Sequence, residues 1–346
     1  MGIIDLRSDT VTHPTDEMRA AMAAAEVGDD VLREDPTVNR LQDVAAERMG
    51  KEAGLLVTSG TMGNLVAVLA HCGRGDETIL GNLAHTFLFE AGGIAALGGV
   101  HSYVLPNQPD GTLALSALRG AVRGDDIHFP ITRLIVLENT HNRCGGTVLT
   151  PVYMRSVGDL AREKGLQVHI DGARIFNAAA ALNLPVANLV QEADSVTFCL
   201  SKGLCAPVGS VLCGSKTFIE KARRIRKQLG GGMRQAGILA AAGLVALEKM
   251  TGRLVEDHVR ARRLAQGLAS IPGLVLDSKE PATNMVFVGL ADEVPFPAAE
   301  AVERLKKLGV RVGAVGDRRF RLVTHYWVDD EGIDITLDAF RCILEK

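Results

Sequence analysis

Short apolar runs alternate with stretches of helical spacing along roughly the first 250 residues. The apolar runs predict seven strands, at 54–58, 78–80, 100–105, 133–138, 167–171, 195–200 and 209–214. Apolar residues at helical spacing predict helices at 14–27, 36–50, 61–71, 83–92, 151–164, 217–229 and 231–250. Near-continuous apolar strands that alternate with helices are typical of a mainly parallel sheet covered by helices on both faces.

The pattern changes at about residue 252. The rest of the chain predicts helices at 253–269, 297–308 and 330–345, and strands at 284–290, 310–313 and 319–325. The length of 346 residues suits two domains at a typical size of about 150 residues each. We therefore predict a large α/β domain over 1–250, which includes an N-terminal arm, and a small α+β domain over 251–346.

Composition and charge narrow the class of protein. The hydrophobic fraction of 47% and the charged fraction of 23% indicate a folded globular chain and exclude a collagen or a coiled coil. The formal net charge of −3 disfavours a nucleic-acid partner, because such proteins usually carry a basic excess. The longest apolar run, 237–247, is too short to span a bilayer, and the N-terminus lacks the apolar core of a signal peptide. We expect a cytoplasmic protein with no membrane partner.

Six cysteines occur without any CxxC pair. Cys199, Cys205 and Cys213 lie among apolar residues, which favours buried free thiols over a disulfide framework. We expect no metal site.

Residues 216–234 form a basic segment with seven Lys or Arg and one acidic residue, Glu220. It is interpretable as a solvated helix face, as a nucleic-acid patch or as a contact to a phosphate. The net charge disfavours the second interpretation, and the other two stay open.

Polar residues follow four of the predicted strands, at 58–64, 139–142, 171–174 and 201–203. In an open α/β sheet, ligands bind beyond the carboxyl ends of the strands. We therefore expect these four clusters to converge on one site.

Ser59, Gly60 and Thr61 lie where a strand turns into a helix. Free N–H groups and the positive end of the helix dipole suit this turn to an anion, although an ordinary helix cap has the same residues. The segment is neither GxGxxG nor GxxxxGK[ST], so it lacks the fingerprint of a dinucleotide site or a P-loop.

Asp171 and Lys202 each follow an apolar strand. Taken alone, Asp171 could be a turn residue and Lys202 a surface lysine. Together they suggest a pyridoxal phosphate (PLP) site, in which the lysine forms a Schiff base, the aspartate pairs with the ring nitrogen and the helix turn holds the phosphate.

The sequence resembles the threonine aldolase family over essentially its whole length. The motifs that carry the resemblance lie at 5–12, 59–64, 84–85, 90, 92–93, 137–141, 169–174, 201–203, 230–235 and 321–325. The resemblance implies PLP-dependent transferase fold type I, the aspartate aminotransferase fold type, with a mainly parallel seven-stranded sheet. Two positions depart from the family: 81–83 lacks the usual acidic residue before His85, and Cys205 replaces a frequent glycine.

The resemblance also implies roles for single residues. Lys202 matches the lysine that binds PLP, Asp171 matches the partner of the ring nitrogen, His85 matches the imidazole that stacks on the ring, and Arg174 matches an arginine near the ring oxygen and the substrate. The implied cofactor-binding set is Ser59, Gly60, Thr61, His85, Asp171, Arg174, Lys202, Lys227 and Arg234.

Other matching positions concern the substrate and a second subunit. Ser8 and Arg321 match the groups that bind the substrate carboxylate, together with Arg174, and His128 matches a second histidine near the substrate hydroxyl. Because the family builds its site across a dimer, Lys227 or Arg234 is expected to reach the cofactor phosphate of a neighbouring subunit. A homotetramer, built as a dimer of dimers, is implied.

These matches imply a carbon–carbon lyase that cleaves L-threonine, L-allo-threonine and related β-hydroxy-α-amino acids to glycine and an aldehyde. The implied catalytic residues are Lys202, His85 and His128. Threonine catabolism and glycine biosynthesis would follow. Two alternatives remain: a PLP-dependent β-eliminating amino-acid lyase, which would release pyruvate and ammonia, and a non-catalytic PLP-binding or nucleotide-binding protein.

Overall fold

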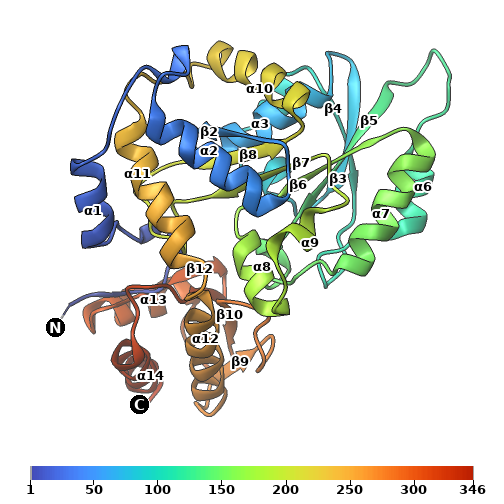
Figure 1. Cartoon of the computed structure of the whole chain (residues 1–346). Coiled ribbons are helices and arrows are strands. Elements are labelled where there is room, and N and C mark those ends of the chain that lie inside the picture. The colour runs from blue at the N-terminus through green and yellow to red at the C-terminus, as the bar shows by residue number, and fades with distance from the viewer. Residues whose placement is uncertain (1, 346) are drawn as a thin grey trace. The chain divides into compact units, whose positions relative to one another are not determined.

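The computed structural model describes residues 2–345. Residues 14–251 form the large unit, and a seven-stranded sheet lies at its centre (Figure 1). Its strands are β2 (Ala53–Val57), β3 (Asp76–Gly81), β4 (His101–Leu105), β5 (Ile131–Glu138), β6 (Gln167–Asp171), β7 (Ser195–Cys199) and β8 (Ser210–Gly214). Their order is β2-β8-β7-β6-β5-β3-β4. Only β8 runs antiparallel to its neighbours, so the predicted mainly parallel sheet is confirmed.

The longer helices begin and end where the sequence supplies caps. Asp35 caps the helix that starts with Pro36, and Gly50 ends it in the left-handed conformation that glycine adopts without strain. Thr150 and Gly165 do the same for the helix that starts with Pro151. The α-helices of the large unit are α1 (Asp16–Ala23), α2 (Pro36–Met49), α3 (Gly60–His71), α4 (His85–Leu88), α5 (Gly93–Ala96), α6 (Leu115–Ala121), α7 (Pro151–Lys164), α8 (Ile175–Leu182), α9 (Val186–Val190), α10 (Lys216–Gln228) and α11 (Gly237–Val245).

Helices cover both faces of this sheet. On one face, α3 and α10 pack against β2 and β8 through an apolar cluster that includes Leu55, Val66 and Leu212. On the other face, α2 contacts β2 and β8, and α7 contacts β6 (Figure 1). At Gly63 an added Cβ would lie 2.4 Å from the side chain of Thr197, so glycine lets α3 approach β7 closely.

Two predicted helices differ from the structure. The stretch 83–92 contains only the short helix α4, and Ala91 and Gly92, with φ values of +52° and +65°, separate it from α5, which starts at Gly93. The stretch 231–250 becomes helical only at Gly237 and ends in one π-helical turn, η4 (Ala246–Met250). Two short 3₁₀ turns also occur, η2 (Asp30–Leu32) and η3 (Asn142–Cys144).

The small unit comprises residues from 252 onward together with the first 13 residues. A four-stranded antiparallel sheet, in the order β12-β13-β10-β9, packs with helices around Phe320 and Phe340. The elements are β1 (Ile4–Asp5), η1 (Asp9–Val11), α12 (Leu254–Ala269), β9 (Leu274–Leu276), β10 (Met285–Leu290), α13 (Ala298–Lys307), β11 (Val310–Arg311), β12 (Gly313–Gly316), β13 (Arg319–Val323) and α14 (Asp330–Leu344).

The N-terminal arm groups with the small unit, whereas the sequence analysis assigns it to the large domain. The reason is backbone pairing: β1 forms a parallel pair with β11, and the Val323 N–H donates to the Leu6 carbonyl at 2.9 Å. Leu6 is fully buried in the core of this unit. The arm that carries Ser8 is therefore fixed to the strands that carry Arg321.

Two further expectations concern membranes and thiols. Within residues 2–345, no helix combines the length and the apolar character needed to cross a bilayer. All six cysteines are free thiols, and Cys199, Cys205 and Cys213 are buried, as expected.

Candidate active site

Two carboxylates lie side by side at the carboxyl ends of neighbouring strands of the large unit. Glu138 ends β5 and Asp171 ends β6, and the two residues are paired in register. Both side chains are buried, with exposures of 6% and 3%. A buried carboxylate is costly unless it is hydrogen-bonded or paired, so this pair marks a candidate site.

Asn64, on the first turns of α3, bridges the carboxylates of this edge. Its Nδ2 donates to Asp171 Oδ2 at 2.9 Å and to Glu90 Oε1 at 2.8 Å. The other oxygen, Asp171 Oδ1, accepts from the backbone N–H of Ala173 at 3.2 Å. Asp171 is therefore held in one orientation by a helix and by the turn that follows its own strand.

His85 begins α4, just after β3, and faces the same carboxylates. Its Nδ1 lies 2.9 Å from Glu90 Oε1, and its backbone N–H donates to Glu138 Oε2 at 2.7 Å. The hydrogen bond with Glu90 raises the pKa of His85 above its usual value, against the effect of burial. With Nδ1 held by Glu90, Nε2 is the ring atom that can exchange a proton with a ligand.

A chain of polar side chains runs from Asn64 into the sheet. His169 Nε2 lies 3.2 Å from Asn64 Oδ1, and His169 Nδ1 lies 2.9 Å from Ser195 Oγ. Ser195 Oγ in turn lies 2.8 Å from His71 Nε2, at the end of α3. Burial lowers the pKa of His169 to about 3 and that of His71 to about 4, so both rings are neutral near pH 7.

Glu138 is a carboxyl of this site whose pKa is raised. It accepts backbone N–H groups from His85 at 2.7 Å and from Asn142 at 2.8 Å. Burial, together with the neighbouring charge of Asp171, nevertheless raises its pKa to about 7. The charge at this edge of the sheet therefore changes within the physiological pH range.

Glu138→Gln is expected to flatten part of the pH dependence of stability. The folded chain keeps the Glu138 proton at pH values where the unfolded chain, with a pKa near 4.5, has released it. This group therefore favours folding most below about pH 4.5, and its contribution declines up to about pH 7. Urea unfolding from pH 4 to 8 measures the slope. The variant is expected to be less stable than wild type below about pH 4.5, since one N–H loses its acceptor, and equal slopes in the two proteins would contradict the assignment.

Ser59, Gly60 and Thr61 form the N-terminus of α3, as predicted. The Ser59 side chain accepts the N–H of Met62 at 3.1 Å, and its carbonyl accepts the N–H of Gly63. The N–H groups of Gly60 and Thr61 come before the first intrahelical bonds, where a helix can bind an anion. An added Cβ at Gly60 would lie 2.9 Å from Cys199 Sγ, so this turn has room only for glycine.

Lys202 and Arg174 lie on the loops that follow β7 and β6. Lys202 is half-buried, and its charge opposes protonation of His85, so the two side chains are within electrostatic reach. Arg174 is buried at the start of α8, three residues after Asp171. Cys205 accepts a φ of +63° while fully buried, which explains physically why glycine is favoured at this position.

The structure does not bring every predicted residue to this cluster. His128 lies before β5, at the opposite end of the strand from Glu138, on a loop that extends outward between α6 and β5 (Figure 1). Its side chain is 78% exposed and pairs with Asp126 at 2.6 Å. Lys227 is exposed on α10, and Arg234 pairs with Asp29 at 2.7 Å.

Ser8 and Arg321 lie in the small unit, which brings them close to each other. Arg321 Nη2 donates to the carbonyl of Arg7, the residue before Ser8, at 3.3 Å. Ser8 caps η1 by accepting the Thr10 N–H. A second contact holds the start of the same arm, where His325 Nε2 lies 2.8 Å from the carbonyl oxygen of Asp5.

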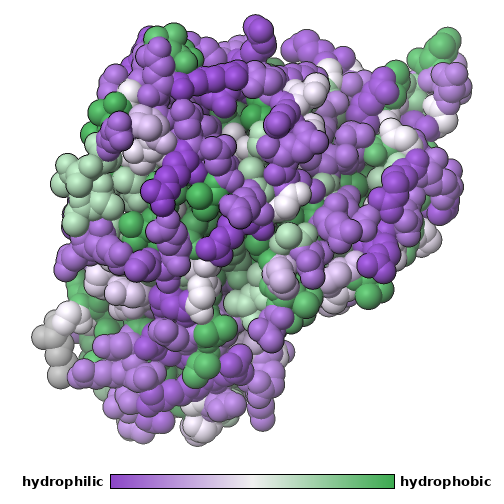
Figure 2. Space-filling model, viewed as in Figure 1, coloured by the Kyte–Doolittle hydropathy of each residue, from purple (hydrophilic) through white to green (hydrophobic). Residues whose placement is uncertain are grey.

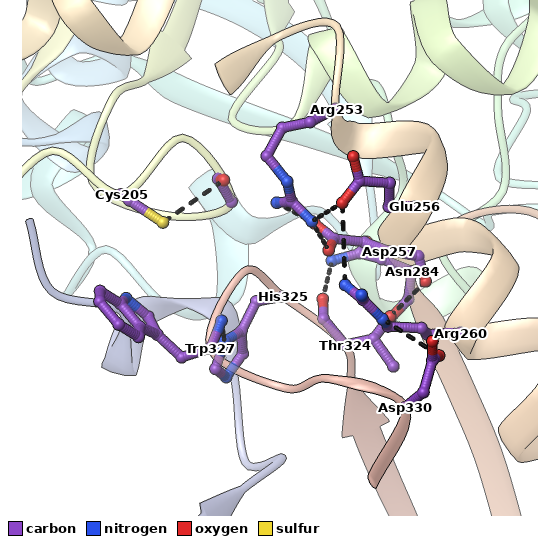
Figure 3. Close-up of polar contacts among 11 residues, drawn as sticks. Cys205, Arg253, Glu256, Asp257, Arg260, Asn284, Thr324, His325, Trp327 and Asp330 are labelled. Atoms are coloured by element: carbon purple, nitrogen blue, oxygen red, sulfur yellow. Dashed lines mark hydrogen bonds and ion pairs between the residues drawn. The ribbon is translucent and has the colours of Figure 1, made fainter. Parts of the chain in front are cut away.

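A buried network holds the end of β13, two residues beyond Arg321 (Figure 3). Thr324 Oγ1 donates to the carbonyl of Asp257 at 2.7 Å, and Asn284 Nδ2 donates to the carbonyl of Thr324 at 2.9 Å. Asp257 is fully buried and pairs with Arg253. The strand that carries Arg321 is therefore anchored to α12 and β10 within its own unit.

Sequence reasoning gave no role to several residues that the structure places at the site. They are Asn64, Glu90, Glu138, His141 and His169. The motifs contain all of them. The positions of Asn64, Glu138 and His141, near the start of α3 or at the end of β5, were the signal available, whereas Glu90 and His169 had none beyond the motif. His141 is 1% exposed, burial lowers its pKa to about 4, and neither ring nitrogen has a hydrogen-bond partner within the described residues.

Comparison with known proteins gives consistent matches. Residues 5–292 match the family described as beta-eliminating lyase. Low-specificity L-threonine aldolase 1 of Arabidopsis thaliana is 48% identical over 99% of this chain and 96% of its own. The solved threonine aldolase of Leishmania major has a TM-score of 0.83 at 19% identity and covers 99% of both chains. A structure of SPT with PLP has a TM-score of 0.76 at 18% identity and covers 98% of this chain and 87% of its own.

Proposed function

Because the chain belongs to the beta-eliminating lyase family, and within it to the threonine aldolases, we propose that it is a PLP-dependent carbon–carbon lyase. It cleaves L-threonine, L-allo-threonine and related β-hydroxy-α-amino acids to glycine and an aldehyde. The observation that carries this proposal is the cluster of His85, Glu90, Asn64 and Asp171 at the carboxyl ends of the strands. It sets one oriented carboxylate beside one histidine that can exchange a proton.

The residues of the large unit fit PLP. Asp171 is buried and oriented, as a partner for a protonated ring nitrogen must be. The N-terminus of α3 offers the N–H groups of Gly60 and Thr61, beside Ser59, to the phosphate. Lys202 would hold the cofactor covalently through Nζ, and Arg174 would face its ring oxygen. When bound, PLP supplies an electron sink for the pair of electrons that the broken Cα–Cβ bond releases.

The chain's own side chains would bind the substrate and move its proton. Arg321 suits a carboxylate, since a guanidinium offers two parallel N–H donors, and Ser8 adds a hydroxyl beside it. His85 Nε2 would take the proton of the substrate hydroxyl, while Glu90 holds Nδ1 and stabilises the charged ring. When the substrate carboxylate is held in one orientation, the Cα–Cβ bond of the substrate would stand perpendicular to the plane of the cofactor ring. This orientation selects the Cα–Cβ bond as the one that breaks.

A second subunit has a place in this proposal. Lys227 and Arg234 would reach the cofactor phosphate of a neighbouring copy, and His128, on its outward loop, would serve a neighbouring site rather than its own. The assembly we propose is a homotetramer built as a dimer of dimers. We further propose a cytoplasmic location and roles in threonine catabolism and glycine biosynthesis.

The test is a product assay with purified enzyme, PLP and L-threonine. Aldol cleavage yields glycine and acetaldehyde in equal amounts, which amino-acid analysis and an aldehyde-coupled assay measure separately. The matched family is described as beta-eliminating lyase, so the competing activity is elimination, which yields ammonia and a 2-oxo acid. Ammonia without glycine would overturn the proposal. Parallel rates with L-allo-threonine and the D isomers define the stereochemical preference.

A further inference from the structure

The loop between α6 and β5, residues 122–130, carries His128 and extends outward from the large unit (Figure 1). Hydrophobic residues lie at the tip of this loop, with hydrophilic residues beside them, at the upper right of Figure 2. Ile127 is 99% exposed, and Phe129 and Ile131 are 47% and 55% exposed. Apolar side chains gathered at one exposed place mark a surface for contact with another protein.

A buried carboxylate holds the two ends of this loop together. Glu77, near the start of β3, is fully buried, and its Oε1 accepts the hydroxyl of Thr132 at 3.0 Å. Arg123, at the other end of the loop, pairs with the same carboxylate through Nε at 3.3 Å. The Arg123 backbone N–H also donates to Thr132 Oγ1 at 3.1 Å. Separating a buried ion pair is costly, so the base of the loop is fixed.

Arg123 also contacts the part of the loop next to His128. Its guanidinium carbon lies 4.6 Å from the ring centre of Tyr103, on β4, and 5.1 Å from the ring centre of Phe129. Cations are attracted to the faces of aromatic rings at these distances. Phe129 directly follows His128, so this contact restricts where the histidine can lie.

His128 is held by a carboxylate two residues before it. Asp126 Oδ1 lies 2.6 Å from His128 Nδ1 and accepts the His128 backbone N–H at 2.9 Å. The backbone N–H and the ring of His128 lower the pKa of the Asp126 carboxyl, so this group is ionised near pH 7 and can only accept hydrogen bonds. The hydrogen of a neutral His128 ring therefore lies on Nδ1, and Nε2 keeps a lone pair.

His85 has the same arrangement, with Glu90 Oε1 at 2.9 Å from Nδ1. In both histidines a carboxylate fixes Nδ1 and leaves Nε2 to exchange a proton with a ligand. The His128 side chain is 78% exposed, so its ring is accessible to a second molecule.

We propose that Asp126 is a positioning residue, which holds His128 so that Nε2 faces the substrate hydroxyl in the site of a neighbouring copy. This inference rests on the proposed function, in which His128 serves that site and His85 lies within it. The hydroxyl gives its single proton to the ring toward which it points, and the two epimers of threonine point it in different directions. Asp126 therefore affects which epimer the enzyme prefers.

The experiment measures kcat and KM of the PLP-loaded enzyme for L-threonine and L-allo-threonine. Asp126→Ala is expected to lower kcat/KM roughly tenfold or more for one epimer, because the ring is no longer fixed for proton transfer. Asp126→Asn should recover part of this loss, since its side-chain oxygen can accept the same two hydrogens. Asp125→Ala is the matched control, because it removes an exposed carboxylate from the adjacent position and should behave as wild type does.

The ratio of kcat/KM for the two epimers separates positioning from a purely structural role. A smaller amount of folded enzyme lowers both values equally, whereas a misplaced His128 changes their ratio. His128→Asn should change the ratio in the same direction as Asp126→Ala. The double variant should lose no more than about twofold beyond His128→Asn, because Asp126 acts through the ring.

Co-expression of His128→Asn with Lys202→Ala tests the neighbouring site. Mixed assemblies contain sites that combine Lys202 of one chain with His128 of the other, so glycine formation per Lys202-bearing chain should exceed that of His128→Asn alone. No such increase, or equal rates and ratios in Asp126→Ala and Asp125→Ala, would overturn the proposal while the lyase activity stands. Wild type that forms ammonia without glycine would overturn the proposed function, and this inference with it.

Discussion

Lys202→Ala is expected to abolish lyase turnover, with a loss of roughly 1,000-fold or more, because it removes the only covalent attachment proposed for PLP. Lys202 is half-buried on the loop after β7 and is electrostatically coupled to His85. No neighbouring lysine occupies the adjoining loop positions 201–206, so the chain offers no substitute there. Turnover is measured as glycine and acetaldehyde, and attachment as the absorbance of bound PLP near the visible edge.

The matched control is Lys216→Ala, which removes an exposed lysine at the start of α10 and should leave both signals unchanged. Circular dichroism shows whether the two variants fold alike. Retention of both the absorbance and the turnover in Lys202→Ala would exclude this residue as the attachment point. It would also remove the main support for PLP chemistry at this edge of the sheet.

Asp171→Asn has the second largest expected effect, a fall in turnover of about 100-fold or more. Asparagine has nearly the same shape but no charge, so a protonated ring nitrogen loses its ionic partner. It also cannot satisfy both existing contacts, because Asn64 Nδ2 and the Ala173 N–H both donate to this side chain. One donor would then face the amide N–H₂, which adds a local penalty.

Asp194→Asn is the control for this substitution. Asp194 Oδ2 accepts the Val168 N–H at 2.7 Å, near the opposite end of β6 from Asp171. Both changes neutralise one carboxylate that contacts the same strand region, but only Asp171 lies at the carboxyl end. Turnover and the absorbance spectrum of bound PLP are compared in the two variants. Equal losses would show that strand stability, rather than charge at the ring nitrogen, explains the effect.

The sheet could be predicted from sequence because its strands are buried on both faces. All five residues of 195–199 are buried, and α3 and α10, which follow β2 and β8, each begin at a serine cap. The helix predicted at 83–92 is shorter in the structure, where it ends at Leu88, and the positive φ values of Ala91 and Gly92 keep it from continuing to residue 92. The N-terminal arm was misplaced because strand pairing between residues 4–5 and 310–311 leaves no signal in either segment alone.

The candidate site shows the same limit. Asp171 and Lys202 stand out because charged residues directly after apolar strands are unusual, and the structure places them on neighbouring strand ends. Glu90 and Asn64 do not stand out, because their importance comes from a shared hydrogen bond across 26 residues of sequence. His128 was chosen from a resemblance, and only the strand direction shows that it lies away from its own Asp171.

The polar chain between Asn64 and His71 has a direction. Asn64 gives both amide hydrogens to Glu90 and Asp171, so its oxygen must accept, and His169 must carry its hydrogen on Nε2. His169 Nδ1 then accepts the Ser195 hydroxyl, whose oxygen accepts the hydrogen of His71 Nε2. Each hydrogen bond of this chain is therefore donated toward the carboxylates of Glu90 and Asp171. Reversing one of these hydrogen bonds would require the others to reverse as well. The buried chain through His169 and Ser195 thus orients the bond dipoles toward the carboxylates in the unliganded protein.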